Sequence, residues 1–563
     1  MKAARSPIKH YFAPFKTPNN ERNNTPMKRT FINPVIPGFT PDPSICRVDN
    51  DYYLITSSFE YFPGVPLFHS RDLVHWRSLG HILDRPSQLN LDNALPSQGI
   101  YAPTIRHHAG TFYMVVTVRG PDGQGGFRDD NIIVSTEDPA GEWSEPITLT
   151  DQPAVIDPSL FFDDDGRAWY MANARVDNEP YPGYRDIWLQ ELDLDKMKLV
   201  GERFLLWNGA LKEASAPEAP HIYKIDGSYY LILAEAGTFH DHAVTIARAD
   251  DVRGPYQGNP RNPILTHRHL GIEQPITNPG HADLIDTPAG EWWMVALASR
   301  PYGGYFYNLG RETFLTPVAW EEGWPVVNPG HGRIRMEEVA PDLAPHPWPS
   351  EPACDHFDSE RLSDQWHFIR TPRTEFHSLS ERPGYLRLKL RPERLEEICN
   401  PSFIGRPQRH INFAARTAFE FAPHTEFESA GLALLQNNDN HFRFVLHGNQ
   451  ICLIERKKGQ EQVLGSKTLS KISPQSTSQC DSAPRIYLKV EARGQEYSFY
   501  AATSSETWYP IAEQVDGRVL STQVAGGFVG AHIGLYATSN GQPSENDADF
   551  DSFEYAALPD SLR

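Results

Sequence analysis

The chain's 563 residues are enough for two or more separately cored domains, and 48 prolines, 40 glycines and an aromatic fraction of 11% are typical of many short strands joined by tight turns. A formal net charge of −20 argues against a duplex nucleic-acid partner, which needs clustered Lys and Arg, and favours a neutral or cationic ligand. Because neither a membrane-length apolar run nor a signal-peptide core is recognisable, we expect an intracellular, cytoplasmic protein with no membrane partner.

The first 30 residues differ in composition from the rest of the chain. They carry seven Lys or Arg against one Glu and show no apolar periodicity. A segment of this kind buries too little apolar surface to offset the entropy lost on ordering. We therefore expect a disordered N-terminal extension over residues 1–30.

A repeat begins near residue 39 and is marked by pairs of aromatic residues within alternating strands. The second members of the pairs are 57 to 63 residues apart along the chain. Each pair follows a turn. The pairs are Tyr52-Tyr53, Phe112-Tyr113, Trp169-Tyr170, Tyr229-Tyr230 and Trp292-Trp293. Repetition of a strand, a turn and an aromatic strand at this period indicates radially arranged blades of four strands.

A second signature stands about ten residues before each aromatic pair and opens a strand. Its copies are DPSI from Asp42, APTI from Ala102, DPSL from Asp157, APHI from Ala219 and HADL from His281. We call these five first residues the blade heads. Five copies of both signatures predict a five-bladed β-propeller over residues 31–338.

The last third of the chain has a different pattern. Residues 339–352 include five prolines and are expected to form a stiff linker. From residue 353 to 563, short alternating strands such as YLRLKL and RIYLKVEA recur, with Gly and Asn turns and no long helical segment. The prediction is an all-β protein in which a concanavalin-like antiparallel β-sandwich follows the propeller.

Three carboxylates stand at or beside the blade heads. Asp42 and Asp157 are themselves heads, and Glu218 precedes the head of the fourth blade. Equivalent strand ends of a propeller converge on the axis, so these carboxylates should face one cavity and raise the proton affinity of at least one of them. One acid and one base then coexist near neutral pH, which is the pair that hydrolysis of a glycosidic bond requires.

Other side chains are candidates for the same cavity. His281 is the head of the fifth blade, and a water or a cation beside it is compatible with the sequence. Arg311 is placed to bind a carboxylate or sugar hydroxyls, and Phe59 and Tyr101 are candidate aromatic platforms. The sequence contains no phosphate-binding glycine loop and no zinc-binding histidine pair, so we expect no required cofactor and no metal in the reaction.

The motifs resemble glycoside hydrolase family 43, most closely its β-xylosidases with a C-terminal β-sandwich. The matching segments include NPVIPGFTPDPSICR, DPSLFFDDDGRAWY, PEAPHIYKIDGSYYLILAEAGT and NLGRETFLTPVAWEEGWP. The resemblance implies that Asp42 is the general base and Glu218 the general acid of an inverting reaction, with Asp157 orienting the acid. It also implies a sugar pocket lined by Phe59, Thr238, His281 and Arg311 and closed by a loop at Phe528.

The chain departs from the family pattern at three places. Tyr101 stands where the family has tryptophan, Ala219 follows the acid in place of glycine, and MANARVDNEP replaces an aromatic after the third-blade strand. We expect an exo-acting β-1,4-xylo-oligosaccharide hydrolase, with arabinoxylan-derived oligosaccharides and α-L-arabinofuranosides as further substrates. A dedicated arabinofuranosidase, a retaining fructan hydrolase and a non-catalytic carbohydrate-binding propeller are the alternatives. A homo-oligomer is compatible with the sequence.

Overall fold

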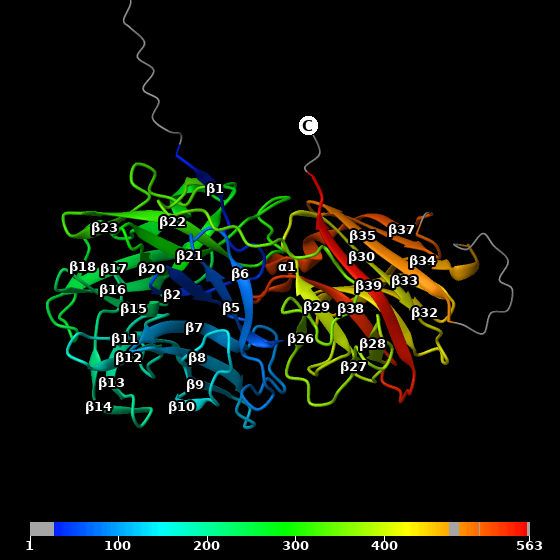
Figure 1. The fold of residues 1–563 in the computed structure, drawn as a ribbon, viewed down its shortest axis with the longest axis horizontal. Coiled ribbons are helices and arrows are strands. Elements are labelled where there is room, and N and C mark those ends of the chain that lie inside the picture. The colour runs from blue at the N-terminus through cyan, green and yellow to red at the C-terminus, as the bar shows by residue number, and fades with distance from the viewer. Residues whose placement is uncertain (1–27, 472–482, 506, 560–563) are drawn as a thin grey trace, which may run out of the picture.

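The computed structural model describes residues 28–471, 483–505 and 507–559. Two bodies built of strands lie side by side, the first coloured blue to green and the second yellow to red (Figure 1). The predicted all-β fold of a five-bladed propeller followed by a sandwich is confirmed. Within the described ranges, no helix has the length and apolar character to cross a membrane.

Each blade is an antiparallel sheet whose strands lie side by side in chain order, except that the fifth strand of blade 4 pairs with the third. Blade 1 holds β2 (Ser44–Val48), β3 (Asp51–Ile55), β5 (Gly64–Ser70) and β6 (Arg77–Leu83). Blade 2 holds β7 (Gly99–His108), β8 (Thr111–Pro121), β9 (Phe127–Thr136) and β10 (Ile147–Thr150), and blade 3 holds β11 (Val155–Phe162), β12 (Ala168–Ala174), β13 (Asp186–Asp193) and β14 (Lys198–Leu205). Blade 4 holds β15 (Glu218–Ile225), β16 (Ser228–Glu235), β17 (Ala243–Ala249), β18 (Gln257–Gly258) and β19 (Leu265–Thr266), followed by η1 (Arg268–Leu270), and blade 5 holds β20 (Thr277–Asp286), β21 (Trp292–Ser299), β22 (Glu312–Glu321) and β23 (Trp324–Val327).

The aromatic pairs lie on the second strand of every blade, which explains their period. One or both members of each pair are buried between blades, as with Tyr52 and Trp293. The Tyr53 ring packs edge-on against Phe112 of the next blade, with ring centroids 5.0 Å apart. Full burial of such a side chain contributes about 1.5–3 kcal/mol, so the repeat is the hydrophobic layer between neighbouring blades.

The ring is closed by segments from its two ends. Strand β1 (Thr30–Ile32) pairs with β24 (Glu337–Val339), and Ile36 bridges to Thr313 of blade 5. Thr30 and Val339, which the sequence placed in the extension and the linker, therefore belong to this closure. Residues 1–27 of the predicted extension lie outside the described residues.

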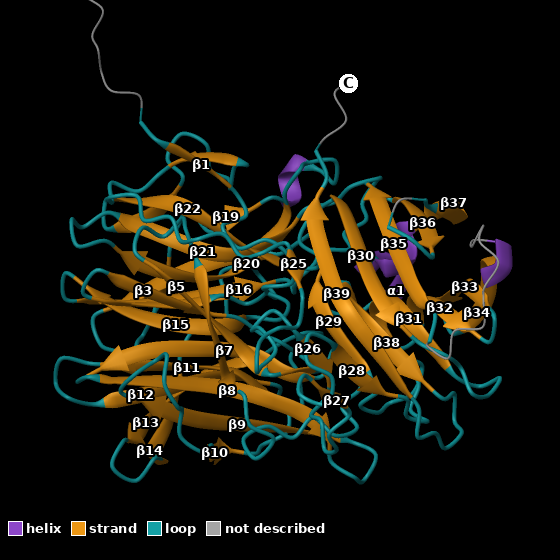
Figure 2. Cartoon of the chain, turned by 45° about the vertical axis from the view of Figure 1, so that its right-hand side comes forward, coloured by secondary structure: helices purple, strands orange, loops and turns teal. Residues whose placement is uncertain are grey.

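The sandwich consists of two antiparallel sheets packed face to face (Figure 2). One sheet has the order β27 (His377–Ser378), β28 (Leu386–Lys389), β39 (Asp547–Ala557), β30 (Asn412–Glu420), β35 (Arg485–Arg493), β36 (Glu496–Ala502) and β37 (Tyr509–Asp516), with β25 (Cys354–Asp355) also on β39. The other has the order β34 (Gln460–Thr468), β33 (Gln450–Lys457), β32 (Asn440–His447), β31 (Ser429–Asn437), β38 (His532–Thr538), β29 (Phe403–Pro407), β26 (His367–Ile369) and β4 (Tyr61–Phe62). Three short helices, η2 (Leu469–Lys471), η3 (Gly517–Leu520) and α1 (Thr522–Ala525), lie in the connections.

The last strand of the second sheet comes from the propeller. Strand β4 lies between β3 and β5 of blade 1 in sequence, and its Phe62 pairs with Phe368 of β26. The Tyr61 ring stacks on His532 of β38 with centroids 3.8 Å apart. The backbone amide of Arg370 donates to the carbonyl of Glu60 at 2.7 Å. The two domains thus share a hydrogen-bonded sheet.

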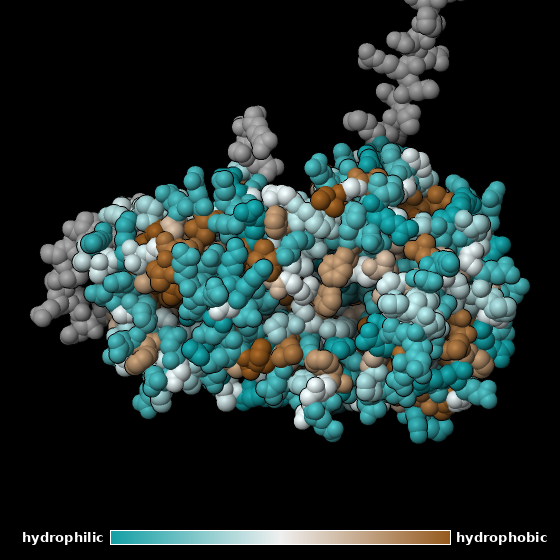
Figure 3. Space-filling view, turned by 180° about the vertical axis from the view of Figure 1, so that it is seen from behind, coloured by the Kyte–Doolittle hydropathy of each residue, from teal (hydrophilic) through white to brown (hydrophobic). Residues whose placement is uncertain are grey.

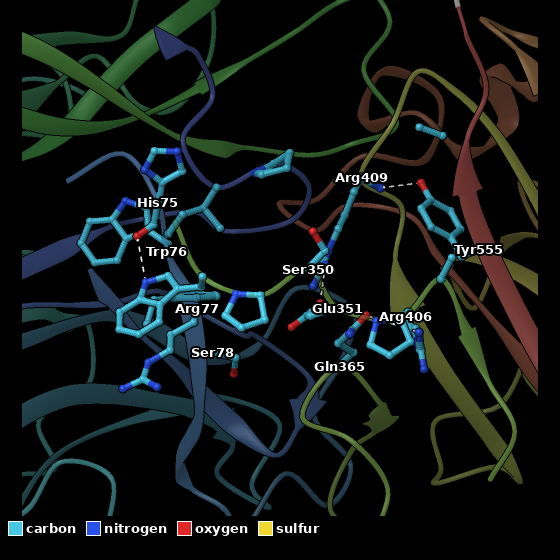
Figure 4. Close-up of a pocket in the computed structure, with 18 of the residues that line it drawn as sticks. His75, Trp76, Arg77, Ser78, Ser350, Glu351, Gln365, Arg406, Arg409 and Tyr555 are labelled. Carbon is cyan, nitrogen blue, oxygen red and sulfur yellow. Dashed lines mark hydrogen bonds and ion pairs between the residues drawn. The ribbon is translucent and has the colours of Figure 1, made fainter. Parts of the chain in front are cut away.

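A cleft of about 630 Å³ lies where blade 1, the proline-rich segment and the sandwich meet (Figure 4). The Trp348 indole donates to the carbonyl of His75 at 3.2 Å, and the Arg409 guanidinium pairs with Glu351 at 3.3 Å. These contacts attach the proline-rich segment to both domains. Seen from behind, the surface is mainly hydrophilic, and its apolar side chains form small separate groups (Figure 3).

Candidate active site

The five blade heads share an unusual backbone conformation. Asp42, Ala102, Asp157, Ala219 and His281 have φ values of 54°, 38°, 54°, 52° and 47°. Left-handed conformations of residues with a Cβ cost about 1–3 kcal/mol each and cluster at functional sites. In blades 2 to 5 the pairing between the first two strands also changes register at this point. The fold therefore interrupts its own hydrogen-bond ladder at the same place around the axis.

A cavity of about 190 Å³ lies at these interruptions. This volume is smaller than the roughly 300–1,000 Å³ of pockets that hold larger ligands, so the cavity suits a single sugar ring better than a chain. All nine residues predicted for the site line it, namely Asp42, Phe59, Tyr101, Asp157, Glu218, Thr238, His281, Arg311 and Phe528. Ala102, Ile156, Gly237, Phe239 and His242 complete the lining.

Asp42 is held as a carboxylate by three neighbours. Its Oδ1 accepts from Arg311 Nη1 at 2.7 Å and lies 3.7 Å from His281 Nδ1, and its Oδ2 accepts from the Ser57 hydroxyl at 2.6 Å. Burial alone would raise the pKa of Asp42, but Arg311, His281 and Ser57 together lower it below its usual value. Asp42 is therefore ionised at neutral pH and is a candidate proton acceptor.

The pKa values of Glu218 and Asp157 are raised, in contrast to that of Asp42. Burial raises the pKa of Glu218 to about 7, and repulsion from Asp42 adds to this, whereas Arg185 and Arg311 oppose it. The pKa of Asp157 is raised well above its usual value by burial and by the neighbouring Glu218. The two carboxyls titrate as a pair, which retains a proton near neutral pH.

Asp157 is also bonded to the backbone that carries Glu218. Its Oδ2 accepts from the amide of Ala219 at 3.2 Å and from the Asn173 side chain at 3.2 Å. Asp157 thus links the head of blade 3 to the head of blade 4. A change at Asp157 would move the segment that places the Glu218 carboxyl.

Aromatic rings from both domains form one wall of the cavity. The Phe59 ring lies 5.2 Å from that of Tyr101 and 6.0 Å from that of Phe528, centroid to centroid. The Arg311 guanidinium carbon lies 5.4 Å from the Phe59 ring and 5.6 Å from the Phe528 ring. Arg311 therefore combines ion pairing to Asp42 with cation–π contact to this wall.

The segment with Phe528 reaches the propeller from the sandwich. The Phe528 amide donates to the hydroxyl of Ser97 at 2.9 Å, and a Cβ on Gly527 would lie 2.3 Å from the same oxygen. At Gly530, a Cβ would lie 2.5 Å from the carbonyl oxygen of Leu309. Glycine at 527 and 530 permits the close approach that brings Phe528 into the cavity.

Several residues of the site were not among those predicted from the sequence. Ser57 accepts from the amide of Ala102 at 2.8 Å while it donates to Asp42, so it connects the first two heads. His242 is buried against Gly280, where a Cβ would lie 2.1 Å from its ring. Arg185 follows MANARVDNEP and acts on the pKa of Glu218. Ser57 lies two residues before Phe59, but nothing in the repeat marks His242 or Arg185.

A second buried network lies next to the heads and involves a fixed positive charge. Arg106 Nη1 donates to Asp283 at 2.8 Å and to the Ser44 hydroxyl at 3.2 Å, and its Nη2 lies 3.1 Å from His221 Nδ1. These partners come from blades 1, 4 and 5, and Arg106 itself comes from blade 2. The guanidinium therefore joins four blades.

Comparison with known families identifies both domains. Residues 31–325 match the model for glycosyl hydrolases family 43, and residues 354–556 match that for the beta xylosidase C-terminal concanavalin A-like domain. The chain belongs to glycosyl hydrolase family 43. This family 43 enzyme is a glycosidase, and the predicted resemblance is confirmed.

Relatives of this family 43 enzyme match it over nearly their whole length. A xylosidase/arabinosidase of Butyrivibrio fibrisolvens is 45% identical over 526 residues, covering 92% of this chain and 98% of the relative. A non-reducing end alpha-L-arabinofuranosidase of Bacteroides ovatus is 38% identical, covering 94% and 96%. The crystal structure of a xylan beta-1,4-xylosidase from Bacillus halodurans superposes with a TM-score of 0.85 at 35% identity, covering 93% and 99%.

Proposed function

We propose that this family 43 glycosidase releases xylose from the nonreducing end of β-1,4-xylo-oligosaccharides with inversion, and that it also cleaves α-L-arabinofuranosides. The observation that carries the proposal is the opposite protonation of two carboxyls in one small cavity. Asp42 is ionised because its pKa is lowered, whereas the pKa of Glu218 is raised to about 7. Relatives named for both activities support the choice of sugars.

Asp42 and Glu218 divide the proton transfers of the reaction. Asp42 takes a proton from water as the water oxygen bonds to the anomeric carbon. Glu218 gives its proton to the glycosidic oxygen as the bond from that oxygen to the anomeric carbon breaks. The sugar leaves with inverted configuration, and exchange with solvent returns both carboxyls to their starting states. Inversion requires a carboxyl separation of roughly 6.5–9.5 Å, which leaves room for the water.

Asp157 acts as a positioning residue in this scheme. It accepts a hydrogen bond from the amide that follows Glu218 and is itself held by Asn173. A fixed backbone at Ala219 keeps the acid in reach of the leaving oxygen. The proposal therefore assigns Asp157 to the orientation of Glu218 rather than to proton transfer.

The small size and the aromatic wall of the cavity support exo-cleavage. Phe59, Tyr101 and Phe528 wall it, and its volume of about 190 Å³ suits one ring. Arg311 and His281 supply hydrogen-bond donors beside Asp42, where the hydroxyls of a terminal sugar would bind. Arg185 follows the segment MANARVDNEP, where the family has an aromatic, and its charge acts on Glu218, so we assign it to the leaving-group side, where it would favour a polar neighbour sugar.

The proposed chemistry uses no cofactor, because an acid, a base and water are sufficient for hydrolysis of a glycosidic bond. A cation beside His281 is not part of this proposal. The Arg106 guanidinium, bonded to Asp283 two residues after His281, already places a fixed positive charge in this part of the propeller.

Hydrolysis of three substrates by the purified chain tests the function. The substrates are the nitrophenyl glycosides of β-D-xylopyranose and α-L-arabinofuranose, together with xylobiose. We expect rapid cleavage of xylobiose and the xyloside and measurable cleavage of the arabinoside. Activity on the arabinoside alone would make the protein a dedicated arabinofuranosidase. Inactivity on all three would favour a carbohydrate-binding propeller.

A further inference from the structure

A cluster of three potential metal ligands lies in the sandwich, outside the site described above. Glu396 is in the segment between β28 and β29, His441 is on β32 and Glu461 is on β34. One ligand atom from each residue lies within 4.8 Å of the other two. In the described part of the chain, one group of three or more His, Cys, Asp or Glu side chains has its ligand atoms this close together, and it is this one.

His441 and Glu396 each have a buried side-chain atom without a partner. His441 Nε2 and Glu396 Oε2 are inaccessible to solvent and form no hydrogen bond with any described residue. The His441 side chain is completely buried, and its Nδ1 lies 3.4 Å from the carbonyl of Asn437. When Nδ1 carries the hydrogen, the lone pair of Nε2 is free for a metal ion. Buried polar atoms are normally satisfied, so both atoms indicate a missing ligand.

The sheet register brings Glu461 to the same place. His441 pairs with Arg456 of β33, and Arg456 pairs with Glu461, so the three residues lie in a row across neighbouring strands. Arg443 Nη2 donates to Glu461 Oε1 at 2.6 Å. A carboxylate has two oxygens, so Glu461 can keep Arg443 on one of them and offer the other to an ion.

We propose that Glu396, His441 and Glu461 bind one divalent transition-metal ion, with Zn²⁺ the favoured ion. An imidazole nitrogen with two carboxylate oxygens is a donor set that Zn²⁺ uses, whereas Ca²⁺ and Mg²⁺ use oxygen ligands. Each carboxylate already has arginine neighbours on its Oε1 atom: Arg394 lies 3.3 Å from that of Glu396, and Arg443 and Arg456 lie 2.6 Å and 3.6 Å from that of Glu461. The ion would therefore take the second oxygen of each carboxylate. Three protein ligands leave a fourth position for water in the tetrahedral arrangement that Zn²⁺ prefers.

The ion would connect three separate segments of the sandwich. The turn that joins β31 and β32 already holds the segment of Glu396, because the Asn438 side chain donates to the carbonyls of Leu395 and Glu397. The same end of β31 holds the backbone on both sides of Phe528. Asn437 donates to the carbonyl of Ala525 at 3.2 Å, and Gln436 donates to that of Val529 at 2.7 Å. The proposed ion thus fastens the framework behind the cavity wall.

Titration calorimetry of the full chain, without a purification tag and after treatment with a chelator, tests the proposal. We expect one Zn²⁺ per chain, little binding of Ca²⁺, and a melting temperature that rises with the Zn²⁺ concentration. Glu461→Gln should weaken Zn²⁺ binding at least tenfold. Glu491→Gln is the matched control, because Glu491 has a side-chain exposure of 38% against 39% for Glu461 and also has a basic partner. The Glu491→Gln variant should bind Zn²⁺ with the affinity of the wild type.

His441→Ala provides the second test, with an expected loss of stoichiometric Zn²⁺ binding. If His441→Ala prevents folding because His441 is fully buried, the Glu461→Gln variant still tests the proposal, because the Glu461 side chain is partly exposed and its replacement leaves the core unchanged. Anomalous scattering at the zinc edge should show an ion between the three side chains. Wild-type affinity in Glu461→Gln, or no Zn²⁺ bound by the wild type, would overturn the proposal. A water bridging His441 and Glu396 would then satisfy these atoms.

Discussion

Arg311 Nη1 lies 2.7 Å from Asp42 Oδ1, while the buried Nε of the same guanidinium has no hydrogen-bond partner in the part of the chain that the structure describes. The ion pair lies in a cavity with aromatic neighbours, where charge interactions are screened less than in water. Arg311 is therefore the strongest of the neighbours that keep Asp42 ionised.

Replacement of Arg311 by Ala should change the pH profile as well as the rate. Arg311 lowers the pKa of Asp42, so its removal raises that pKa and the base becomes protonated at a higher pH. We expect the acidic limb of kcat/KM to move upward in pH and the maximum to fall about 100-fold. Arg311→Lys, which keeps the charge, should retain a limb nearer to that of the wild type. An unshifted acidic limb in Arg311→Ala would contradict this assignment.

Removal of the proposed acid should discriminate between leaving groups. Glu218→Ala should lower kcat/KM for xylobiose by about 10²–10⁴-fold, because its leaving oxygen must be protonated. A dinitrophenyl xyloside, whose leaving group is stable without a proton, should lose far less. The pKa of about 7 for Glu218 also predicts that wild-type activity falls above about pH 7. Equal losses on both substrates would exclude Glu218 from the acid role.

Asp42→Ala should abolish turnover with either leaving group, since both require activation of water. The fold should persist but the melting temperature should fall, because the buried Arg311 loses its carboxylate partner and keeps only longer contacts with Thr238 and with the carbonyl of Phe528. Glu202→Ala, at an exposed site of blade 3, serves as the control and should leave both rate and stability unchanged. Residual hydrolysis by Asp42→Ala above a small percentage would rule out Asp42 as the base.

Glu60→Gln should make the protein less sensitive to alkaline pH. Burial raises the pKa of Glu60 to about 7, although the Arg370 charge and the Ser97 amide oppose this. The folded protein thus binds a proton more tightly than the unfolded chain, and the associated stability is present below about pH 4.5 and lost as pH rises through about 7. At about 1.4 kcal/mol per pKa unit, the loss is at most roughly 3 kcal/mol. Melting temperatures at pH 5 and pH 8 should differ less in Glu60→Gln than in the wild type.

Phe528→Ala should open the cavity wall without disturbing the propeller. The loss of one aromatic face raises KM for xylobiose about tenfold, with a smaller change in kcat, because contacts made equally in ground and transition states are removed. Phe427→Ala, at an exposed aromatic of the sandwich remote from the cavity, is the control. If KM remained unchanged in Phe528→Ala, the loop would not form part of the sugar site.

The blade repeat made much of the site predictable from the sequence. Asp42, Asp157 and His281 hold equivalent positions in their blades, and equivalent positions converge on the axis by symmetry. Residues outside the repeat carry no such signal. His242 reaches the cavity because Gly280 lacks a side chain. The Ser57 hydroxyl is held by the backbone amide of Ala102, which is 45 residues away in sequence. Contacts of this kind depend on the three-dimensional packing of separate blades.

The sheet that the two domains share could not be predicted from the sequence. Strand β4 has two residues, Tyr61 and Phe62, which is too short to show a period. Its partner Phe368 is more than 300 residues further along the chain. Alternation predicts that strands exist, but it does not predict which edges pair across domains.

Because β4 completes a sheet of the sandwich, the catalytic and accessory domains cannot be exchanged as independent modules. A propeller expressed alone would leave the hydrogen-bonding edge of Tyr61 and Phe62 uncovered and would lose the wall residue Phe528. A sandwich expressed alone would lose its outermost strand. Recombination of this propeller with another sandwich would succeed only where the incoming domain supplies both a matching edge and a loop that reaches Ser97.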